Sequence, residues 1–363
     1  MRVFLQFEKR PLFFHNPKYI VTCYNPLFFT SSIREIEHAV ECGYYAAGFI
    51  SYEAGYCFEN RRQENKSYDF PLMCMGIFEA PSAPAFRIDS SRSVLKNFRL
   101  NISRERYFTN INRIREYIRQ GDIYQLTYCI KLLFRFEGDP FSLFTSLLSA
   151  QPVPYPAYIE TGDCTILSLS PEMFIKKNSA SIVTKPMKGT WPRGNTVISD
   201  FFSRVRFQFD EKNRAENLMI TDLLRNDLGR IGSNIKVPKL FEVARYKTLY
   251  QMTSTVTGAV DKNISLYNLF ASLFPSGSVT GAPKIRAMEI VQELEDEERH
   301  IYTGAIGYIA PGKNLFFNIP IRTLLLKGNS GEMGIGGGIV WDSTPEGEWE
   351  EGMLKARFIL RQE

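Results

Sequence analysis

The segment 210–228 is predicted to be a helix that carries a carboxylate on its apolar face. Glu216 lies four residues before Ile220 and seven before Leu223, and such offsets place side chains on the same side of a helix. A carboxylate in that position needs a partner, because burial of an unpaired charge costs several kcal/mol. Glu216 is therefore a candidate ligand for a cation.

The last predicted helix shows the same pattern. Ser343 and Glu346 fit a capping box at its start. Glu351 then shares a helical face with Leu354 and Phe358. A divalent cation held by both acids would compensate their charge, and Mg²⁺ suits such a site because it binds a few carboxylates together with water and substrate oxygens. The alternative is that each acid pairs with an arginine or a helix N-terminus.

Lys188 lies in the loop TKPMKGTWPRG, together with Lys185 and Arg193. Like-charged neighbours and partial burial both lower the pKa of a lysine, and a neutral amine is a nucleophile. Lys188 is therefore a candidate for covalent catalysis. The alternative is a solvated lysine, as in most loops rich in proline and glycine.

Three further features are typical of anion binding. In FPSGSVTGAPKIRAMEI, small residues precede Pro283, which we expect in the first turn of a helix, where backbone N–H groups can bind an anion. Gly336, Gly337 and Gly338 interrupt a strand-like run, which indicates a bulge, a close approach to a ligand, or a structural turn. Arg322 lies in the apolar run NIPIRTLLL, so it is expected to meet a buried anion, either a ligand or a structural carboxylate.

These residues must be positioned by a mixture of strands and helices without a regular βαβ repeat. That mixture predicts an α+β fold with large antiparallel sheets and helices outside them. The predicted strands are 43–52, 164–175, 248–260, 302–309, 315–326 and 333–341. The predicted helices are 103–120, which ends at Gly121, then 210–228, 283–296 and 344–361.

Composition limits the remaining possibilities. The chain has 363 residues, of which 44% are hydrophobic, and no polar linker divides it. We expect one large folding unit with an N-terminal subregion, 1–100, and a catalytic region, 101–363. The net charge of +5 is scattered, which argues against nucleic acid as a partner, and no apolar run is long enough for a membrane span. The six widely spaced cysteines and the absence of signal-peptide order at the start predict a cytoplasmic protein.

Several ordered stretches resemble the chorismate-utilising enzymes, a family that includes anthranilate, isochorismate, salicylate and aminodeoxychorismate synthases. The resemblance extends over residues 103–360 and implies a sandwich of two large, mostly antiparallel sheets. Its stretches are GDIYQLTYC (121–129), SPEMF (170–174), KPMKGT (185–190), ENLMITDLLRNDLGR (216–230), PSGSVTGAPKIRAMEI (275–290), IYTGAIGYI (301–309), FNIPIRTL (317–324) and the region 334–356.

The resemblance implies a role for each matching position. Glu216 and Glu351 would hold Mg²⁺, which binds the ring carboxylate of chorismate. Tyr302 and Arg322 would bind the enolpyruvyl carboxylate, and Glu172 would protonate the departing ring hydroxyl. Further substrate-binding positions, some acting through backbone groups, would be Gly189, Thr190, Thr280, Gly336 and Gly338, together with Gln125 and Gln251.

Three positions distinguish the branches of the family. Water-using members have lysine where this chain has Gln125, so ammonia is the expected nucleophile. Anthranilate synthases typically have alanine where this chain has Lys188, whereas aminodeoxychorismate synthases have lysine. Many members have histidine where this chain has Gln251, and that histidine is linked to pyruvate elimination. The resemblance therefore favours a product that retains the enolpyruvyl group.

The resemblance implies conversion of chorismate and ammonia into 4-amino-4-deoxychorismate for 4-aminobenzoate and folate biosynthesis, through a covalent intermediate on Lys188. No Gly-x-Cys-x-Gly motif of a glutamine amidotransferase is present, so ammonia is expected from a separate glutaminase subunit or from free ammonium. The alternatives are an anthranilate synthase component I and, from another class, a family member that binds chorismate without turnover.

Overall fold

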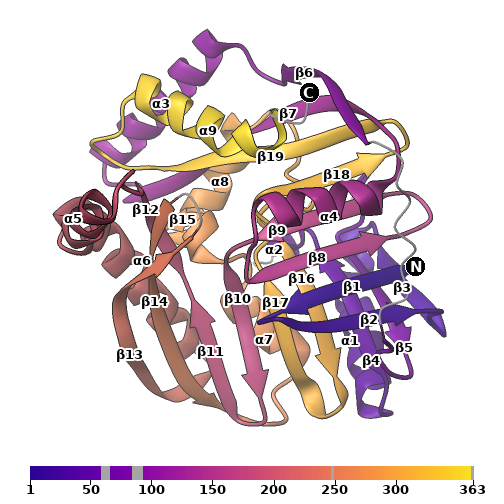
Figure 1. Ribbon diagram of the computed structural model, residues 1–363. Helices are drawn as coiled ribbons and strands as arrows, with labels where there is room; N and C mark the ends of the chain where they lie inside the picture. Colours follow the sequence, from indigo (N-terminus) through magenta and orange to yellow (C-terminus); the bar gives the residue numbers. More distant parts are fainter. Residues whose placement is uncertain (59–65, 84–92, 247–248, 361–363) are drawn as a thin grey trace.

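Two antiparallel β-sheets dominate the computed structural model, which describes residues 1–58, 66–83, 93–246 and 249–360. Within these residues sheet A has the strand order β15-β7-β19-β18-β9-β8-β1-β2, with β6 also paired to β7 (Figure 1). Its strands are β1 (Arg2–Phe7), β2 (Arg10–His15), β6 (Val94–Leu100), β7 (Gln125–Glu137), β8 (Tyr155–Glu160), β9 (Thr165–Ser170), β15 (Gly281–Ala282), β18 (Thr323–Lys327) and β19 (Ser330–Ile339).

Sheet B has the order β12-β14-β11-β10-β17-β16-β4-β5-β3, with β13 also paired to β14. The N-terminal hundred residues supply strands to both sheets. The strands of sheet B are β3 (Tyr19–Cys23), β4 (Tyr45–Ile50), β5 (Met73–Phe78), β10 (Met173–Asn178), β11 (Ser181–Lys185), β12 (Met187–Pro192), β13 (Gly232–Arg245), β14 (Leu249–Val260), β16 (Ala305–Ala310) and β17 (Asn314–Asn318).

Helices cover the outer faces of both sheets, so the predicted α+β sandwich is confirmed. α1 (Phe29–Glu41), α2 (Ala54–Phe58) and α7 (Leu266–Leu273) share a core with sheet B. α3 (Arg104–Arg119), α4 (Pro140–Ala150), α8 (Lys284–Leu294) and α9 (Pro345–Leu360) share a core with sheet A. α5 (Val197–Gln208) and α6 (Glu211–Gly229) contact β12 and β13 at one end of the molecule (Figure 1). No described helix is long and apolar enough to cross a membrane.

An apolar core fills only one end of the space between the sheets. Phe14 and Leu325 of sheet A belong to the same buried cluster as Phe49 and Phe316 of sheet B. At the other end, where β7 and β19 approach the region of β12 and β14, buried side chains include Gln125 and others that are polar. This polar end contains the candidate site.

Two predicted helices, 103–120 and 210–228, begin where the sequence predicts, whereas the one predicted cap is wrong. Ser103 caps α3, and Asp210 caps α6 by accepting a hydrogen bond from the N–H of Asn213 at 2.9 Å. The capping box predicted on Ser343 and Glu346 is wrong: Thr344 caps α9 by accepting from the N–H of Gly347 at 3.2 Å. The Ser343 hydroxyl instead donates to the carboxylate of Glu348 at 2.6 Å.

Two segments predicted as single strands are each divided between the sheets. The segment 164–175 forms β9 in sheet A and then β10 in sheet B, and the break contains Pro171. The segment 315–326 forms β17 in sheet B and then β18 in sheet A, and its break contains Pro320. Proline lacks the N–H group that a central strand must donate, so each strand ends near it.

Candidate active site

Glu172 lies at the first of these two crossings and is 2% exposed. Its Oε1 accepts a hydrogen bond from the hydroxyl of Ser278 at 2.7 Å and from the N–H of Met187 at 3.3 Å. Burial raises the pKa of Glu172 to about 7, although Ser278 and the charge of Lys188 act in the opposite direction. Near neutral pH this carboxyl can therefore hold a proton and donate it.

The two crossings run side by side and are bonded to one another. The N–H of Ile319 donates to the carbonyl of Glu172 at 3.1 Å, and the N–H of Leu169 donates to the carbonyl of Arg322 at 3.1 Å. The predicted acid, Glu172, and the predicted anion-binding residue, Arg322, are thus fixed on adjacent segments of backbone.

Lys188 lies on β12, and its amine reaches across the gap to sheet A. A Cβ atom added at Gly338 of β19 would lie 2.9 Å from Nζ of Lys188 and 2.4 Å from Nε2 of Gln125. Burial lowers the pKa of Lys188, while the carboxylates of Glu216 and Glu172 raise it. The amine and Gln125 therefore both lie against Gly338, and the predicted acid is close enough to alter the pKa of Lys188.

The glycine run 336–338 explains how the side chains of Lys188 and Gln125 can lie so close to β19. β19 pairs with β7 without a register shift from Ser330 to Ile339, so the bulge considered for Gly336–Gly338 is absent from this described strand. The strand instead closely approaches other side chains of the protein, while a close approach to a ligand stays a prediction. Gly338 makes room for Lys188 and Gln125, and a Cβ at Gly336 would lie 3.0 Å from the hydroxyl of Tyr302.

Two buried glutamines of the two sheets, Gln125 on β7 and Gln251 on β14, have polar atoms without a partner among the described residues. Both side-chain atoms of Gln125 and the Oε1 atom of Gln251 form no hydrogen bond within the described chain. Gln125 is fully buried and Gln251 is 5% exposed. An unpaired buried polar group is costly, so these amides favour a polar ligand between the sheets.

Arg322 forms no ion pair or hydrogen bond through its guanidinium within the described residues. Burial lowers the pKa of Arg322, and the nearby Tyr246 opposes that effect. The structural carboxylate considered as an alternative partner for Arg322 is thus not found in the described part of the chain. A half-buried arginine without an acidic partner is suited to binding an anionic ligand.

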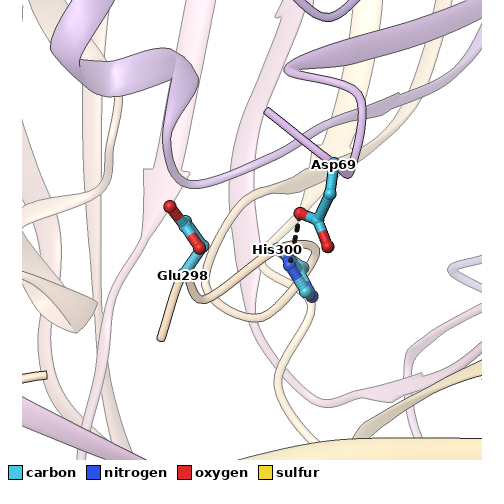
Figure 2. Close-up of side chains that lie close together, drawn as sticks. All are labelled: Asp69, Glu298 and His300. Carbon is cyan, nitrogen blue, oxygen red and sulfur yellow. Dashed lines mark ion pairs between the residues drawn. The ribbon is translucent and has the colours of Figure 1, made fainter. Parts of the chain in front are cut away.

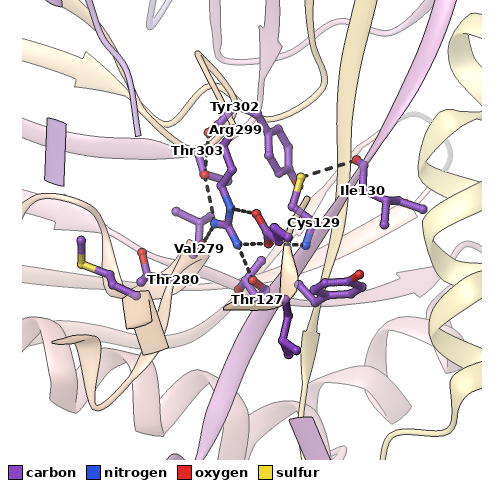
Figure 3. Close-up of polar contacts among 12 residues, drawn as sticks. Thr127, Cys129, Ile130, Val279, Thr280, Arg299, Tyr302 and Thr303 are labelled. Atoms are coloured by element: carbon purple, nitrogen blue, oxygen red, sulfur yellow. Dashed lines mark hydrogen bonds and ion pairs between the residues drawn. The ribbon is translucent and has the colours of Figure 1, made fainter. Parts of the chain in front are cut away.

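Tyr302 is the second predicted residue for that anion. It is 6% exposed, and burial raises its pKa. Figure 3 shows its ring beside Cys129 of β7, close to the buried side chain of Arg299. Its hydroxyl lies next to Gly336, on the same strand as Gly338.

The two predicted metal ligands face the same region from two helices. Burial raises the pKa of Glu216, Lys188 lowers it, and the charge of Glu351 raises it, so the two acids interact. Glu216 forms no hydrogen bond or ion pair within the described residues. Glu351 pairs with Lys355 at 2.8 Å, which partly supports the ion-pair alternative for this acid. Two carboxylates near one another, one of them without a partner, fit a divalent cation.

The apolar stripe predicted around Glu351 is confirmed for Phe358, which packs against the core of sheet A, and is wrong for Leu354. Leu354 is 54% exposed, whereas α9 packs on sheet A through Ala356 and Ile359. The three-residue offset places Leu354 on the same side of the helix as Glu351, but at that position the side of the helix faces away from the core. On α6 the buried face includes Ile220, and Glu216 lies at its edge.

The remaining predicted residues lie around the same end of the sandwich. Thr190 of β12 is exposed and is paired in register with Gln251 of β14. Gly189 has a φ of 88° and faces Asn213 of α6. Thr280 is fully buried, and its carbonyl accepts a hydrogen bond from the N–H of Thr127 at 2.8 Å.

Sequence reasoning missed several residues of this site. Lys355 donates to the carbonyl of Gly336 at 2.8 Å and so joins α9 to the glycine run. Glu348 lies beside Gly337, and burial raises its pKa. The signal was available, because residues three before and four after Glu351 share its helical face. Ser278 gave no comparable signal, since a loop serine has no periodicity.

A different group of side chains, not predicted, could also hold a metal ion. The ligand atoms of Asp69, Glu298 and His300 lie within 4.8 Å of one another (Figure 2). Each already has a protein partner: His300 Nε2 lies 3.4 Å from Asp69, and Glu298 pairs with Lys66 at 2.6 Å. This group contains neither Glu216 nor Glu351.

The six cysteines are free, as the sequence predicted.

Comparison with known proteins identifies the family. The family model for chorismate binding enzymes matches residues 78–361. Aminodeoxychorismate synthase component 1 of Klebsiella aerogenes is 37% identical over 298 residues, which are 82% of this chain and 65% of that protein. Anthranilate synthase component 1 of Aquifex aeolicus is 36% identical over 268 residues, which are 73% of this chain and 54% of that protein. The chain thus spans less than two thirds of the length of these relatives.

Two solved structures share the fold. Anthranilate synthase component I from Streptococcus pneumoniae superposes with a TM-score of 0.82 at 24% identity and covers 98% of this chain and 92% of its own. The menaquinone-specific isochorismate synthase MenF from Escherichia coli superposes with a TM-score of 0.79 at 15% identity, covering 99% and 88%. With the family match over residues 78–361, this chain belongs to the chorismate binding enzymes.

Proposed function

We propose that this chain is an aminodeoxychorismate synthase component that converts chorismate and ammonia into 4-amino-4-deoxychorismate. The observation that carries the proposal is the amine of Lys188 beside Gly338 and Gln125, with the predicted acid Glu172 close enough to alter its pKa. Relatives named aminodeoxychorismate synthase component 1 are 37% identical in Klebsiella aerogenes and 38% identical in Escherichia coli.

The charges of the site suit a dianion such as chorismate. Arg322 has no acidic partner in the described chain, and Tyr302 is its proposed partner in binding the enolpyruvyl carboxylate. The ring carboxylate is assigned to the region of Glu216 and Glu351, which would hold Mg²⁺. When bound, Mg²⁺ would neutralise and orient that carboxylate.

The proposed chemistry divides one substitution into two steps. The neutral amine of Lys188 forms a bond to C2 while the ring double bonds shift, and the C4 hydroxyl leaves as water with the proton of Glu172. Ammonia then forms a bond to C4, the double bonds shift back, and the bond between C2 and Lys188 breaks. The lysine nitrogen leaves with the proton that ammonia loses. Covalent catalysis replaces one difficult displacement with two easier ones.

The proposed source of ammonia is a separate glutamine amidotransferase subunit. The name "component 1" of the relatives implies a second component, and this chain has no Gly-x-Cys-x-Gly motif. Free ammonium should therefore support turnover by the isolated chain, although less efficiently than a glutaminase partner with glutamine.

The second candidate is anthranilate synthase component I, because anthranilate synthases are as similar in sequence, at 36% and 38% identity. The discriminating residues are Lys188 and Gln251. A lysine at the site favours the 4-amino product, and a glutamine in place of histidine favours retention of the enolpyruvyl group.

Product identification by mass spectrometry tests the proposal. Purified protein is incubated with chorismate, Mg²⁺ and ammonium, with and without an aminodeoxychorismate lyase. We expect a product that becomes 4-aminobenzoate only when the lyase is added. Fluorescent anthranilate without lyase would establish the second candidate instead. Chorismate binding without any product would favour the non-catalytic alternative.

A further inference from the structure

Arg299 is among the largest fully buried side chains of the protein, and every N–H of its guanidinium is used. Nε and Nη2 donate to the carboxylate of Glu295 at 2.8 and 2.6 Å. Nη2 also donates to the carbonyl of Thr127 at 2.5 Å, and Nη1 donates to the carbonyl of Val279 at 3.0 Å and the hydroxyl of Thr303 at 3.3 Å. A guanidinium has five N–H donors, so none is left unpaired.

The partners of Arg299 belong to three segments that are distant in sequence (Figure 3). Thr127 is on β7, two residues after Gln125. Val279 directly precedes Thr280. Thr303 follows Tyr302, whose N–H donates to the carbonyl of Arg299 at 3.1 Å. Each segment therefore carries one proposed substrate-binding residue. Arg299 itself has no N–H donor left for the substrate, because its protein partners use all five.

Glu295 extends this network to the glycine run. Its Oε1 accepts a hydrogen bond from the N–H of Cys129 at 2.8 Å. In the β7–β19 ladder Cys129 is opposite Gly336, and Thr127 is opposite Gly338. The ion pair between Arg299 and Glu295 thus contacts the backbone of β7 at Thr127 and Cys129. These two residues lie opposite Gly338 and Gly336.

The pair is too costly to be explained as a simple source of stability. Burial acts to lower the pKa of Arg299, but Glu295 and other neighbours, Tyr52 among them, together raise it well above its usual value, so the arginine remains charged. Buried ion pairs often contribute little net stability compared with apolar residues of similar volume, whereas they define geometry precisely. The ring of Tyr52, 4.3 Å from the guanidinium carbon, closes the remaining side.

We propose that Arg299, paired with Glu295, is a positioning residue that sets the spacing of Tyr302, Thr280 and the β7–β19 edge around the substrate. It touches no reacting atom and acts through the backbone of the three segments. This inference rests on the proposed function, because it assumes that chorismate binds among those segments.

The test compares two glutamate substitutions of similar structural cost. Glu295→Gln weakens the pair in the network. Glu37→Gln is the matched control. Glu37 of α1 also accepts a hydrogen bond from a backbone N–H, that of Leu266 at the start of α7, at 3.2 Å, and from the amine of Lys313, just before β17, at 2.6 Å. For each protein the melting temperature, kcat and the KM for chorismate are measured with ammonium and Mg²⁺.

We expect Glu295→Gln to raise the KM for chorismate about tenfold or more, because small displacements of binding groups cost binding and rate steeply. Glu37→Gln should lower the melting temperature by a comparable amount while its KM stays within about twofold of the parent, since it touches no site segment. A similar melting shift with unchanged KM in both variants would overturn the proposal and leave the pair a purely structural feature.

A milder variant keeps the test valid if Glu295→Gln fails to fold. Thr303→Ala removes one of the five acceptors and should raise KM less than Glu295→Gln, in the same direction; an unchanged KM would overturn the proposal. Failure of the proposed function has a separate signature. The unsubstituted protein would then make anthranilate or no product, and the positioning role would fall only if chorismate did not bind.

Discussion

The amine of Lys188 lies so close to Gly338 that a Cβ atom at that glycine would be 2.9 Å from it. The two residues come from different sheets, β12 of sheet B and β19 of sheet A. The glycine run is therefore explained by what lies opposite it, since any side chain at position 338 would occupy the space that the amine uses.

This relationship predicts the effect of Gly338→Ala. The new methyl group would displace the flexible ends of Lys188 and Gln125, both of which can move without unfolding the strand. We expect a folded protein whose kcat/KM falls about 100-fold, as is typical when a reacting group is displaced by about 1 Å. Steady-state kinetics with chorismate and ammonium measure this loss. Gly162→Ala is the control, because a Cβ there meets no atom within 4 Å; equal activity of both variants would contradict the arrangement.

The buried carboxyl of Glu172 is expected to be needed for activity but to lower the stability of the fold when it is ionised. Its pKa is raised to about 7 in the folded protein from 4.5, so the fold favours the protonated form. This contribution is complete below about pH 4.5 and is lost as the pH rises through about 7. Glu172→Gln keeps an uncharged acceptor for Ser278 and Met187. The variant should be inactive yet more stable than the parent at about pH 8, by on the order of 3 kcal/mol.

Denaturant unfolding between about pH 5 and pH 8 measures this difference. The free energy of unfolding of the parent should fall relative to that of the variant as the pH rises. A difference that does not change with pH would show that Glu172 is not protonated in the folded protein at neutral pH.

The proposed role of Glu351 as a metal ligand predicts how the activity depends on the Mg²⁺ concentration. Glu351→Gln removes one of the two proposed ligand charges, so the Mg²⁺ concentration for half-maximal activity should rise at least about tenfold. Glu346→Gln on the same helix is the control, because Glu346 is exposed and has no ion pair in the described chain. Activity that is unaffected by a chelator in the parent protein would exclude the proposed role of the metal.

The proposed role of Arg322 in binding a carboxylate of chorismate predicts how a substitution there changes the KM. Arg322→Lys keeps a positive charge but loses the planar pair of donors, and a hydrogen bond to a charged group contributes about 1.5–3 kcal/mol. The KM for chorismate should therefore rise about tenfold or more, with a smaller change in kcat. The surface substitution Arg225→Lys should change neither value. If Arg322→Lys binds chorismate as tightly as the parent, the carboxylate must lie elsewhere.

Local chemistry explains which parts of the fold could be predicted from the sequence. The start of α3 was predictable because Ser103 satisfies the free N–H groups of a helix N-terminus. The two crossings at Glu172 and Arg322 were not recognised, because strand-forming residues continue on both sides of Pro171 and Pro320. The choice of sheet after each proline depends on pairing with distant strands, which has no local signal.

The same distinction between local signals and distant contacts applies to the residues of the candidate site. Residue type and spacing indicated that Glu216, Glu351 and Arg322 are unusual. The stripe inferred around Glu351 was wrong for Leu354, because periodicity identifies a face without saying what the face contacts. The meeting of Lys188 with Gly338 depends on how two sheets approach one another. Only the tertiary structure contains that information.

The most direct test of the account compares the products of the parent protein and Lys188→Ala by mass spectrometry, with chorismate, Mg²⁺ and saturating ammonium. The account predicts 4-amino-4-deoxychorismate from the parent and a loss of that product of at least about 100-fold in Lys188→Ala, since a nucleophile has been removed. Anthranilate from the parent, or an unchanged rate of 4-amino-4-deoxychorismate formation in Lys188→Ala, would contradict it.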